Sequence, residues 1–402
     1  MSILNEAGSI PSFFACSFMK SPFLCIPFYK SFRMRLLFLF IFVSISTALT
    51  AQVVDSTVVD STVVDSTAAK PSAPRVVKDT VTLVGVGDIM MGTSYPESML
   101  PPDDGAFLMK DVEPYLNDAD VTFGNLEGTL LDTGGTPKTC HDPKVCYVFR
   151  TPVRFVKNLK SAGFDMMSLA NNHAGDFGET GRQSTMKTLN AEDIKHAGQV
   201  VQKYVLLTKD SLTYGLVAFA PNSGCVNLND LEGAKQLVAH LDSICDIVIV
   251  SFHGGAEGAQ YQNVPRTHEL FHGEDRGDVF KFSHTLIDAG ADVVFGHGPH
   301  VTRAVEVYNE RFIAYSMGNF CTYRGISVSG VNGLAPIIKL YTDAHGKFYK
   351  GKITPTYQTY GGGVKVDPQN QVIKRIQELT KKDFPESKIQ IAENGLITYL
   401  AQ

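Results

Sequence analysis

The chain has 402 residues, of which 44% are hydrophobic and 19% are charged, and its formal net charge is −5. A chain of this length and composition can bury a full core, which excludes an intrinsically disordered protein. The small net charge, without any run of Lys or Arg, argues against a protein that binds nucleic acid through its phosphates.

The amino end is typical of a secretory signal. Basic residues precede an apolar run over 36–43, and small residues follow it from Ser44 to Ala51. Even counted to Leu49, the run stays short. We therefore predict a signal peptide over 1–51, with 1–33 read from an upstream start codon because Met34 is a natural start. The apolar run is shorter than the roughly 20 residues of a spanning helix, which favours removal over retention as an anchor. The sequence predicts an exported protein, periplasmic or associated with the cell envelope.

A low-complexity linker is predicted over 52–77, where Val-Val-Asp-Ser-Thr occurs three times, and one folded domain over 78–402. Apolar runs then alternate with helical patterns. Strands are predicted over 81–86, 119–123, 164–169, 216–219, 246–252 and 291–295, with helices over 152–162 and 279–287. This alternation predicts an α/β sheet covered by helices on its faces.

After residue 300 the pattern changes to short β segments. We predict strands over 304–308 and 312–316 joined by a hairpin at Asn309-Glu310, β structure over 334–358, a helix from Asp367-Pro368 to about Lys381, and a strand over 395–400.

Two cysteines of the domain lie close together in sequence. In an exported protein Cys140 and Cys146 can close a small disulfide loop. The alternative is that both are free small hydrophobic residues.

Six short polar motifs lie mostly where predicted apolar runs stop. They are Gly87-Asp88, Asn125-Leu126-Glu127, Asn171-Asn172-His173, His253 with Glu257, Gly296 to His300, and Gly318-Asn319-Phe320. Strand ends of an α/β sheet present groups to a ligand, so the motifs are expected to converge on one site. Their carboxylates, carboxamides and imidazoles suit a divalent metal such as Mn, Zn or Fe.

Several motifs have a second interpretation. Asp88 is predicted as a metal ligand and not as part of a dinucleotide loop, because an Asp in that turn would repel a pyrophosphate. Asn125 and Glu127 share one side of an extended segment, although Asn125 can instead cap a turn and leave Glu127 solvated. His268 and His272 resemble further ligands, but we interpret them as a solvated helix or lid.

The ordered motifs over about residues 80–322 resemble the CapA family, named for poly-γ-glutamate capsule synthesis. The resemblance rests on Gly-Asp-Ile-Met-Met-Gly, Asn-Leu-Glu, Asn-Asn-His followed by Asp176, His-x-Gly-x-Glu, Gly-His-x-Pro-His-Val and Tyr-Ser-Met-Gly-Asn-Phe. It implies a metallophosphoesterase-like fold, which is a two-sheet α/β sandwich with outer helices, and a role at the cell envelope.

The wider calcineurin-like phosphoesterases bind two metals through similar motifs, and the resemblance assigns roles residue by residue. It implies metal ligands at Asp88, Glu127, Asn172, His253, His297 and His300, with catalytic roles for His173, as proton donor, and Asp88. Substrate contacts are expected from Asn125, Glu257 and Asn319. The chain departs from the pattern at Met90, where the first His would be, at the closing pair His297 and His300, which is His-x-x-His and not His-x-His, and at Gly254, where relatives often have Trp. One ion or two is left open.

The sequence thus favours a metal-dependent hydrolase of the cell envelope that acts on a phosphoester or an amide. Its expected partners are an anionic polymer or phosphoester substrate and a capsule-synthesis membrane complex, and no nucleic acid. The alternative is a non-catalytic export or scaffold component that binds an anionic polymer.

Overall fold

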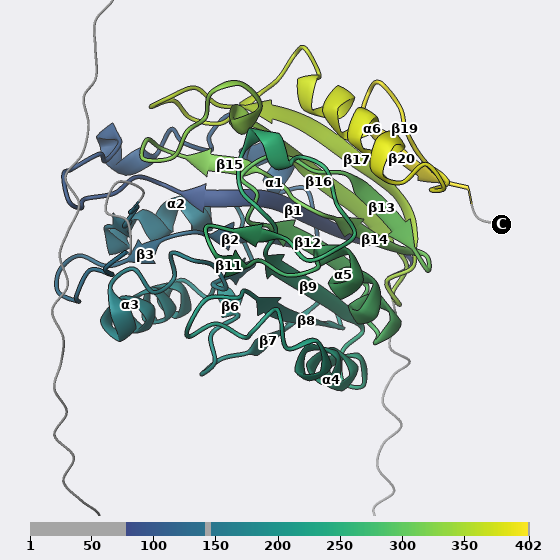
Figure 1. Ribbon diagram of the computed structural model, residues 1–402, viewed down its shortest axis with the longest axis horizontal. Helices are drawn as coiled ribbons and strands as arrows, with labels where there is room; N and C mark the ends of the chain where they lie inside the picture. Colours follow the sequence, from purple (N-terminus) through teal and green to yellow (C-terminus); the bar gives the residue numbers. More distant parts are fainter. Residues whose placement is uncertain (1–77, 141–145, 401–402) are drawn as a thin grey trace, which may run out of the picture. The chain divides into compact units, whose positions relative to one another are not determined.

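The computed structural model describes residues 78–140 and 146–400. The predicted signal peptide and linker therefore lie outside the described residues. Within these ranges, two large sheets form the body of the domain (Figure 1).

The larger sheet has ten strands in the order β19-β20-β17-β16-β1-β2-β5-β6, with β15 beside β1 and β18 beside β17. Its strands are β1 (Val81–Met90), β2 (Val121–Leu126), β5 (Met166–Ser168), β6 (Lys195–Ala197), β15 (Asn319–Thr322), β16 (Leu334–Thr342), β17 (Phe348–Tyr357), β18 (Lys365–Val366), β19 (Ile389–Ile391) and β20 (Leu396–Tyr399). Strands β1, β2, β5 and β6 run parallel to one another.

The smaller sheet has six strands in the order β13-β14-β12-β9-β8-β7. They are β7 (Tyr204–Lys209), β8 (Leu212–Phe219), β9 (Ile247–His253), β12 (Val293–His297), β13 (Val305–Tyr308) and β14 (Arg311–Ala314). Two short pairs lie outside both sheets: β3 (Thr129–Leu130) with β4 (Arg150–Thr151), and β10 (Leu270–Phe271) with β11 (Glu274–Asp275).

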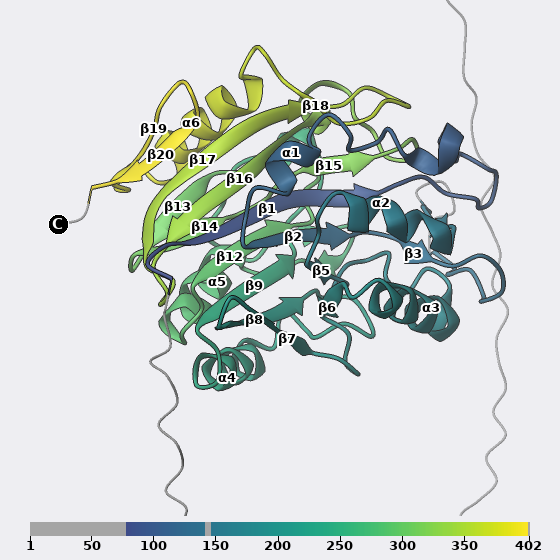
Figure 2. The same cartoon turned by 180° about the vertical axis from the view of Figure 1, so that it is seen from behind.

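All but the last of the helices cover the outer faces of the two sheets, and the last one contributes Val372, Ile373 and Ile376 to the core on the inner face of the larger sheet. The helices are α1 (Glu113–Leu116), α2 (Val156–Ser161), α3 (Gly178–Ala191), α4 (Leu231–Asp242), α5 (Val279–Asp288) and α6 (Gln371–Asp383), with short 3-10 turns at Pro102–Gly105, Val153–Phe155, Ala259–Tyr261 and Gly330–Gly333. Helices α1, α2 and α3 pack on the larger sheet, and α4 and α5 on the smaller one. Figure 2 shows α1 and α2 alongside β1 and β2.

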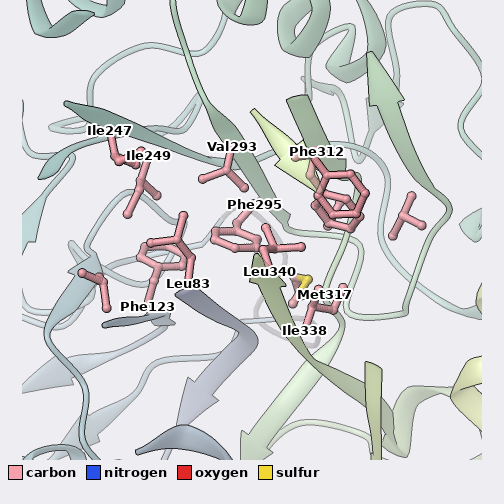
Figure 3. Packing of buried hydrophobic residues seen from close by; sticks show 14 of the residues in the cluster. Leu83, Phe123, Ile247, Ile249, Val293, Phe295, Phe312, Met317, Ile338 and Leu340 are labelled. Carbon is pink, nitrogen blue, oxygen red and sulfur yellow. The ribbon is translucent and has the colours of Figure 1, made fainter. Parts of the chain in front are cut away.

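The main core lies between the two sheets. Side chains alternate along each strand, so Leu83 of β1 points into this core while its neighbour Val84 packs under the outer helices. The rings of Phe123 and Phe295 stack across the interface with centroids 5.5 Å apart (Figure 3). Gly85 makes room for this stack, because a Cβ there would lie 2.4 Å from the Phe295 ring.

The predicted two-sheet α/β sandwich with outer helices is confirmed. The hairpin at Asn309-Glu310 is also confirmed, since β13 and β14 pair on either side of these two residues. Both have positive φ, 47° and 61°, as a two-residue turn of this hand requires.

Two predicted elements were wrong in detail. The helix expected from Asp367 begins at Gln371, although the Asp367 carboxylate still accepts a hydrogen bond from the Gln371 N–H at 2.8 Å. The segment with His268 and His272 is not a helix. It contains the β10-β11 hairpin, whose turn places His272 at φ 48°.

Cys140 and Cys146 form a disulfide with their Cα atoms 5.5 Å apart, so the first of the two interpretations holds. Among the described residues, no helix has the length and apolar character needed to cross a membrane.

The inter-sheet core predicts a large effect of shortening Phe295, which is fully buried. Phe295→Ala should lower the free energy of unfolding by about 3–5 kcal/mol, because the cavity removes contacts to both sheets. Urea unfolding of the purified protein measures this change. Tyr349→Ala is the matched control, since that aromatic residue is 48% exposed and its loss should change the free energy by about 0.5 kcal/mol or less. Equal losses in the two variants would contradict the assignment of the core.

Candidate metal centre

The parallel strands bring the polar motifs to one edge of each sheet. Asp88 pairs in register with Asn125 between β1 and β2. In the smaller sheet His253 pairs with His297 at the ends of β9 and β12. The carboxyl ends of parallel strands meet at the same edge, which is why these residues gather although they are far apart in sequence.

A close backbone contact joins Asp88 to a later part of the chain. The Asp88 N–H donates to the Gly318 carbonyl at 2.8 Å. Gly87 allows this approach, because a Cβ on it would lie 2.0 Å from the same oxygen. Asn319, which follows Gly318, is thereby brought to the same site.

Asp88 is fully buried and lies among nitrogen donors. Its Oδ1 is 3.0 Å from His297 Nδ1 and accepts from Asn125 Nδ2 at 2.9 Å. Its Oδ2 is 3.1 Å from His300 Nδ1. Burial alone raises the pKa of Asp88, but the hydrogen bonds from His297 and His300 outweigh it and hold the pKa below its usual value. Asp88 is therefore ionised.

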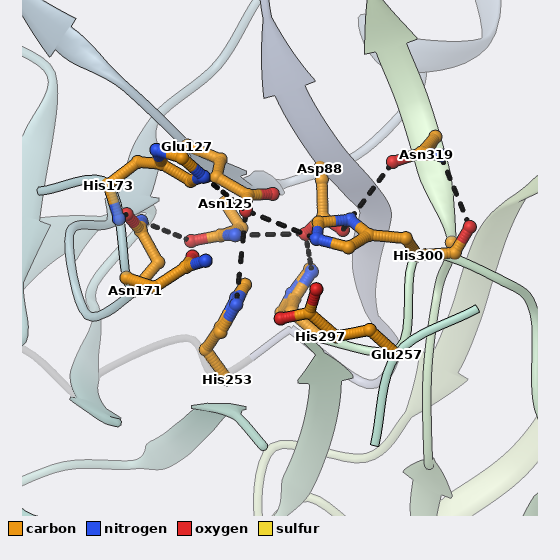
Figure 4. A network of polar contacts seen from close by, with 12 residues as sticks. Asp88, Asn125, Glu127, Asn171, His173, His253, Glu257, His297, His300 and Asn319 are labelled. Atoms are coloured by element: carbon orange, nitrogen blue, oxygen red, sulfur yellow. Dashed lines mark hydrogen bonds and ion pairs between the residues drawn. The ribbon is translucent and has the colours of Figure 1, made fainter. Parts of the chain in front are cut away.

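Glu127 lies among three imidazoles (Figure 4). Its Oε1 is 3.4 Å from His300 Nε2, 3.9 Å from His253 Nε2 and 4.0 Å from His173 Nε2. Glu127, His253 and His300 each offer a ligand atom, and these three atoms lie within 4.8 Å of one another. The group has the size and the mixed O/N donors of a site for a divalent ion.

The residues present fit a metal ion, because several buried polar atoms have no hydrogen-bond partner. These atoms are both carboxylate oxygens of Glu127, both ring nitrogens of His253, Nε2 of His297 and Oδ1 of Asn172. Buried polar groups are normally paired, and such a concentration of unpaired donor atoms is what a coordinated cation would satisfy. Burial also lowers the pKa of His253 well below its usual value, which keeps it in the neutral form that binds metals.

Without a cation the centre takes up protons. Burial raises the pKa of Glu127 to about 8. Burial opposes protonation of His300, but the negative charges of Glu127 and Asp88 prevail and raise its pKa to about 10. Both shifts show that this pocket favours added positive charge near Glu127.

His173 is held by a second carboxylate on its far side. Its Nδ1 is 2.8 Å from Asp176 Oδ2, and Lys138 Nζ forms an ion pair with Asp176 Oδ1 at 2.6 Å. The Phe149 ring lies against the imidazole, with centroids 4.4 Å apart. Burial lowers the pKa of His173 although Asp176 opposes the shift. Its Nε2 is the ring nitrogen nearest Glu127.

The buried asparagines hold the charged groups in place. Asn125 donates to Asp88 and accepts from Asn171 Nδ2 at 3.1 Å. Asn319 Oδ1 is 3.1 Å from His300 Nδ1, and its amide donates to three backbone carbonyls. Asn125 and Asn319 are fully buried. Their predicted contact with substrate stays a prediction, and the contacts present support Asp88 and His300.

A cleft of about 890 Å³ opens over this centre. Its wall includes Asn172, His173, His300 and Glu257, all four named from the sequence. Glu257 is half-buried and its Oε1 accepts from Arg276 at 2.8 Å.

Two of the departures from the expected motifs, Met90 and Gly254, lie in well-defined surroundings. The Met90 sulfur, fully buried, accepts a hydrogen bond from the Gly92 N–H at 3.2 Å. At Gly254 a Cβ would lie 2.5 Å from the Leu228 side chain and 2.8 Å from the Arg276 carbonyl, so a Trp has no space there.

The sequence analysis did not identify the residues that hold the charged groups in place, nor the cationic side chains that line the cleft. Asn171 and Asp176 stood in quoted motifs but received no role. Lys138, Arg182 and Arg276 line the cleft from segments without a strand-end motif. Only Asp176 carried a usable signal, because it follows His173 at a spacing of three residues.

Comparison with known proteins agrees with the order of the motifs. Residues 82–324 match the model of a family described as bacterial capsule synthesis protein PGA_cap. The chain is 29% identical over 266 residues to the capsule biosynthesis protein CapA of Bacillus anthracis, covering 61% of each protein, which is less than two thirds of that relative's length. It is 28% identical over 350 residues to the PGA biosynthesis protein CapA of Bacillus subtilis, covering 82% of this chain and 84% of that protein.

Among solved structures, a hypothetical protein from Thermus thermophilus aligns with a TM-score of 0.42 and 17% identity, over 71% of this chain and 100% of that one. This score is too low to support a conclusion.

The donor cluster predicts that the protein binds a divalent ion through Glu127 and His253. Glu127→Gln and His253→Ala should each weaken metal binding by more than about 10-fold, the smallest loss expected even for residues that only support a ligand. Metal analysis after dialysis and calorimetric titration with Mn²⁺ or Zn²⁺ measure this loss. His345→Ala is the matched control, because this histidine is exposed and lies outside the cleft. Unchanged binding in both site variants would contradict the centre.

The raised pKa values of Glu127 and His300 predict how the metal-free protein responds to pH. Both groups hold protons more tightly when folded, so the folded state binds more protons than the unfolded chain. The free energy of unfolding should therefore fall as the pH rises from about 6.5 to about 8, by about 2 kcal/mol per pH unit for the two groups together. Glu127→Gln should flatten this slope. Urea unfolding in the presence of a chelator measures it, and a slope unaffected by the substitution would refute the prediction.

Proposed function

The chain belongs to the bacterial capsule synthesis protein family PGA_cap, and from this premise we propose that it is a metal-dependent hydrolase of the cell envelope in the synthesis or export of an anionic capsule polymer. The observation that carries the proposal is the group of Glu127, His253 and His300 with its unpaired buried atoms. This group lies at a cleft that also contains His173.

The family and the named relatives support an anionic capsule polymer as the source of the substrate. The relatives in the two Bacillus species are named for capsule and PGA biosynthesis. Poly-γ-glutamate is a chain of carboxylates joined by amide bonds, so an amide of such a polymer is one candidate bond for hydrolysis and a phosphoester is the other. A location outside the cytoplasm follows from the signal peptide predicted over 1–51 and is part of the proposal.

The ion would be held by Glu127, His253 and His300, with Asp88, His297 and Asn172 as the further predicted ligands. When bound, a divalent ion of the Mn, Zn or Fe type polarises an ester or amide oxygen and lowers the pKa of a water. The protein supplies ionised Asp88 and neutral His253 for this purpose.

His173 is the residue proposed to exchange a proton with the reacting group. The contact between Nδ1 and Asp176 fixes the ring orientation and leaves Nε2 as the exchanging atom. Lys138 balances the charge of Asp176, so Asp176 orients the ring without adding a net negative charge.

A non-catalytic export or scaffold component is the second candidate. Met90 favours it, because a thioether stands where the resemblance expects an imidazole ligand. In that case the cleft would bind an anionic polymer, and the metal would only hold the fold of the site together.

The hydrolase proposal predicts that His173→Ala lowers kcat by about 10²- to 10⁴-fold, because a positioned proton donor is lost. Metal content should be unchanged, since His173 is not one of the proposed ligands. The assay uses the metal-loaded protein with bis-p-nitrophenyl phosphate and with a γ-linked glutamate oligomer. His272→Ala is the matched control, a second histidine of the cleft wall that has no proposed role in the chemistry.

The two candidate functions differ in one further outcome. Folded protein that hydrolyses neither compound with metal bound would refute the hydrolase. The amount of capsule polymer is then measured in cells that carry Asp88→Asn. Normal amounts of polymer despite loss of the metal would favour the scaffold function.

A further inference from the structure

One cation in the cleft differs from the others in its partners. Arg182 belongs to α3 and lines the cleft together with Asn172 and His173. Its Nη1 donates to Gln199 Oε1 and its Nη2 to the Ser223 carbonyl at 2.6 Å. The Cys225 thiol is a further neighbour of the guanidinium. All three partners are neutral.

The other two cations of the cleft wall are balanced by carboxylates. Lys138 pairs with Asp176, and Arg276 pairs with Glu257. Within residues 78–140 and 146–400, Arg182 forms no ion pair. A guanidinium has five N–H donors, so at least two remain after the neutral neighbours are satisfied. Its charge is thus available to a ligand in the cleft.

Two glycines fix where this guanidinium lies. A Cβ at Gly175 would be 2.3 Å from Arg182 Nη2, and a Cβ at Gly224 would be 2.6 Å from its Cζ. The Arg182 guanidinium therefore occupies space that a side chain at position 175 or 224 would fill. Gly175 lies two residues after His173, so the same loop positions both side chains. Arg182 is half-buried and remains open to the cleft.

A neighbouring side chain also lacks a partner. Asn222 Oδ1 is buried without a hydrogen bond, and Asn222 lines the cleft beside Ser223, whose carbonyl Arg182 contacts. The Arg182 charge suits an anionic group, whereas the unpaired Asn222 oxygen requires an N–H or O–H donor from another part of the same ligand.

We propose that Arg182 binds an anionic group of the substrate, a carboxylate or a phosphate, and so sets the substrate specificity of the centre. The planar fork of a guanidinium matches both anions with two parallel N–H donors. The proposal rests on the proposed function in that the bound anion belongs to the molecule that reacts at the metal centre.

The test compares anion binding by the full-length wild-type protein and by Arg182→Gln, with the metal content of each measured. The probes are a γ-linked glutamate trimer and inorganic phosphate, titrated calorimetrically. A charge-assisted hydrogen-bond pair is lost, so the affinity for at least one probe should fall about 10- to 100-fold. Loss for the trimer alone identifies a carboxylate, and loss for phosphate alone identifies a phosphate.

Lys187→Gln is the matched control, because Lys187 is an exposed residue of the same helix outside the cleft wall and its substitution removes the same charge. It should leave both affinities unchanged. Arg182→Lys keeps the charge without the fork and should weaken binding about tenfold, which provides a test should Arg182→Gln fail to fold.

Equal affinities in wild type and both Arg182 variants would overturn the proposal, and so would an equal loss in Lys187→Gln. Binding of neither probe by the wild-type protein would also overturn it. These readings are separate from hydrolysis: an inactive protein that still loses anion affinity on substitution of Arg182 would refute the hydrolase and leave the anion site standing.

Discussion

The candidate centre depends on burying ionisable groups where water does not reach them. Asp88, Glu127, His253 and His297 are all fully buried. Removing one carboxylate from water costs several kcal/mol unless an opposite charge compensates, and two carboxylates lie here within reach of the same imidazole, His300. Without a cation, Glu127 avoids this cost by holding a proton, because burial raises its pKa to about 8. A bound cation is the simplest compensation, and the packing of the two sheets provides the rigid walls that such an ion requires.

Asparagine is suited to the support of this centre because its amide bonds to charged groups without adding charge. Asn171 donates to Asn125, which in turn donates to Asp88, so one uncharged relay fixes the carboxylate. Asn319 fixes the His300 ring through its side-chain oxygen, again without adding charge. A charged residue in either place would upset the balance around the metal site. The carboxylate of Asp176 is tolerated because Lys138 pairs with it.

The strand ends could be predicted from sequence, because a buried strand reads as an apolar run and the polar residue that stops the run lies at the edge of the sheet. Asp88 and His253 were found in this way. Helix α3 was not, since two of its four buried residues are Gly181 and Thr185, which weakens its apolar periodicity. Helix α4 was missed although its buried residues Ala234, Val238 and Leu241 lie at helical spacing. The partners of Asn125 also could not be found, because a hydrogen bond between segments 46 residues apart leaves no local pattern. For the same reason Arg182 and Lys138 went unnoticed.

Loops and strands therefore contribute differently to the cleft. The proposed ligands come from strands of the two sheets or from the loops at their carboxyl ends, whereas the cleft cations come from α3 and from irregular segments. The segment around the disulfide illustrates the second case. Lys138 and Phe149, on either side of Cys140 and Cys146, both contact Asp176, through Nζ at 2.6 Å and through a backbone N–H at 2.6 Å. A cross-link between the two sides limits how far they can separate. The disulfide thus helps to keep both contacts on Asp176, the partner of His173.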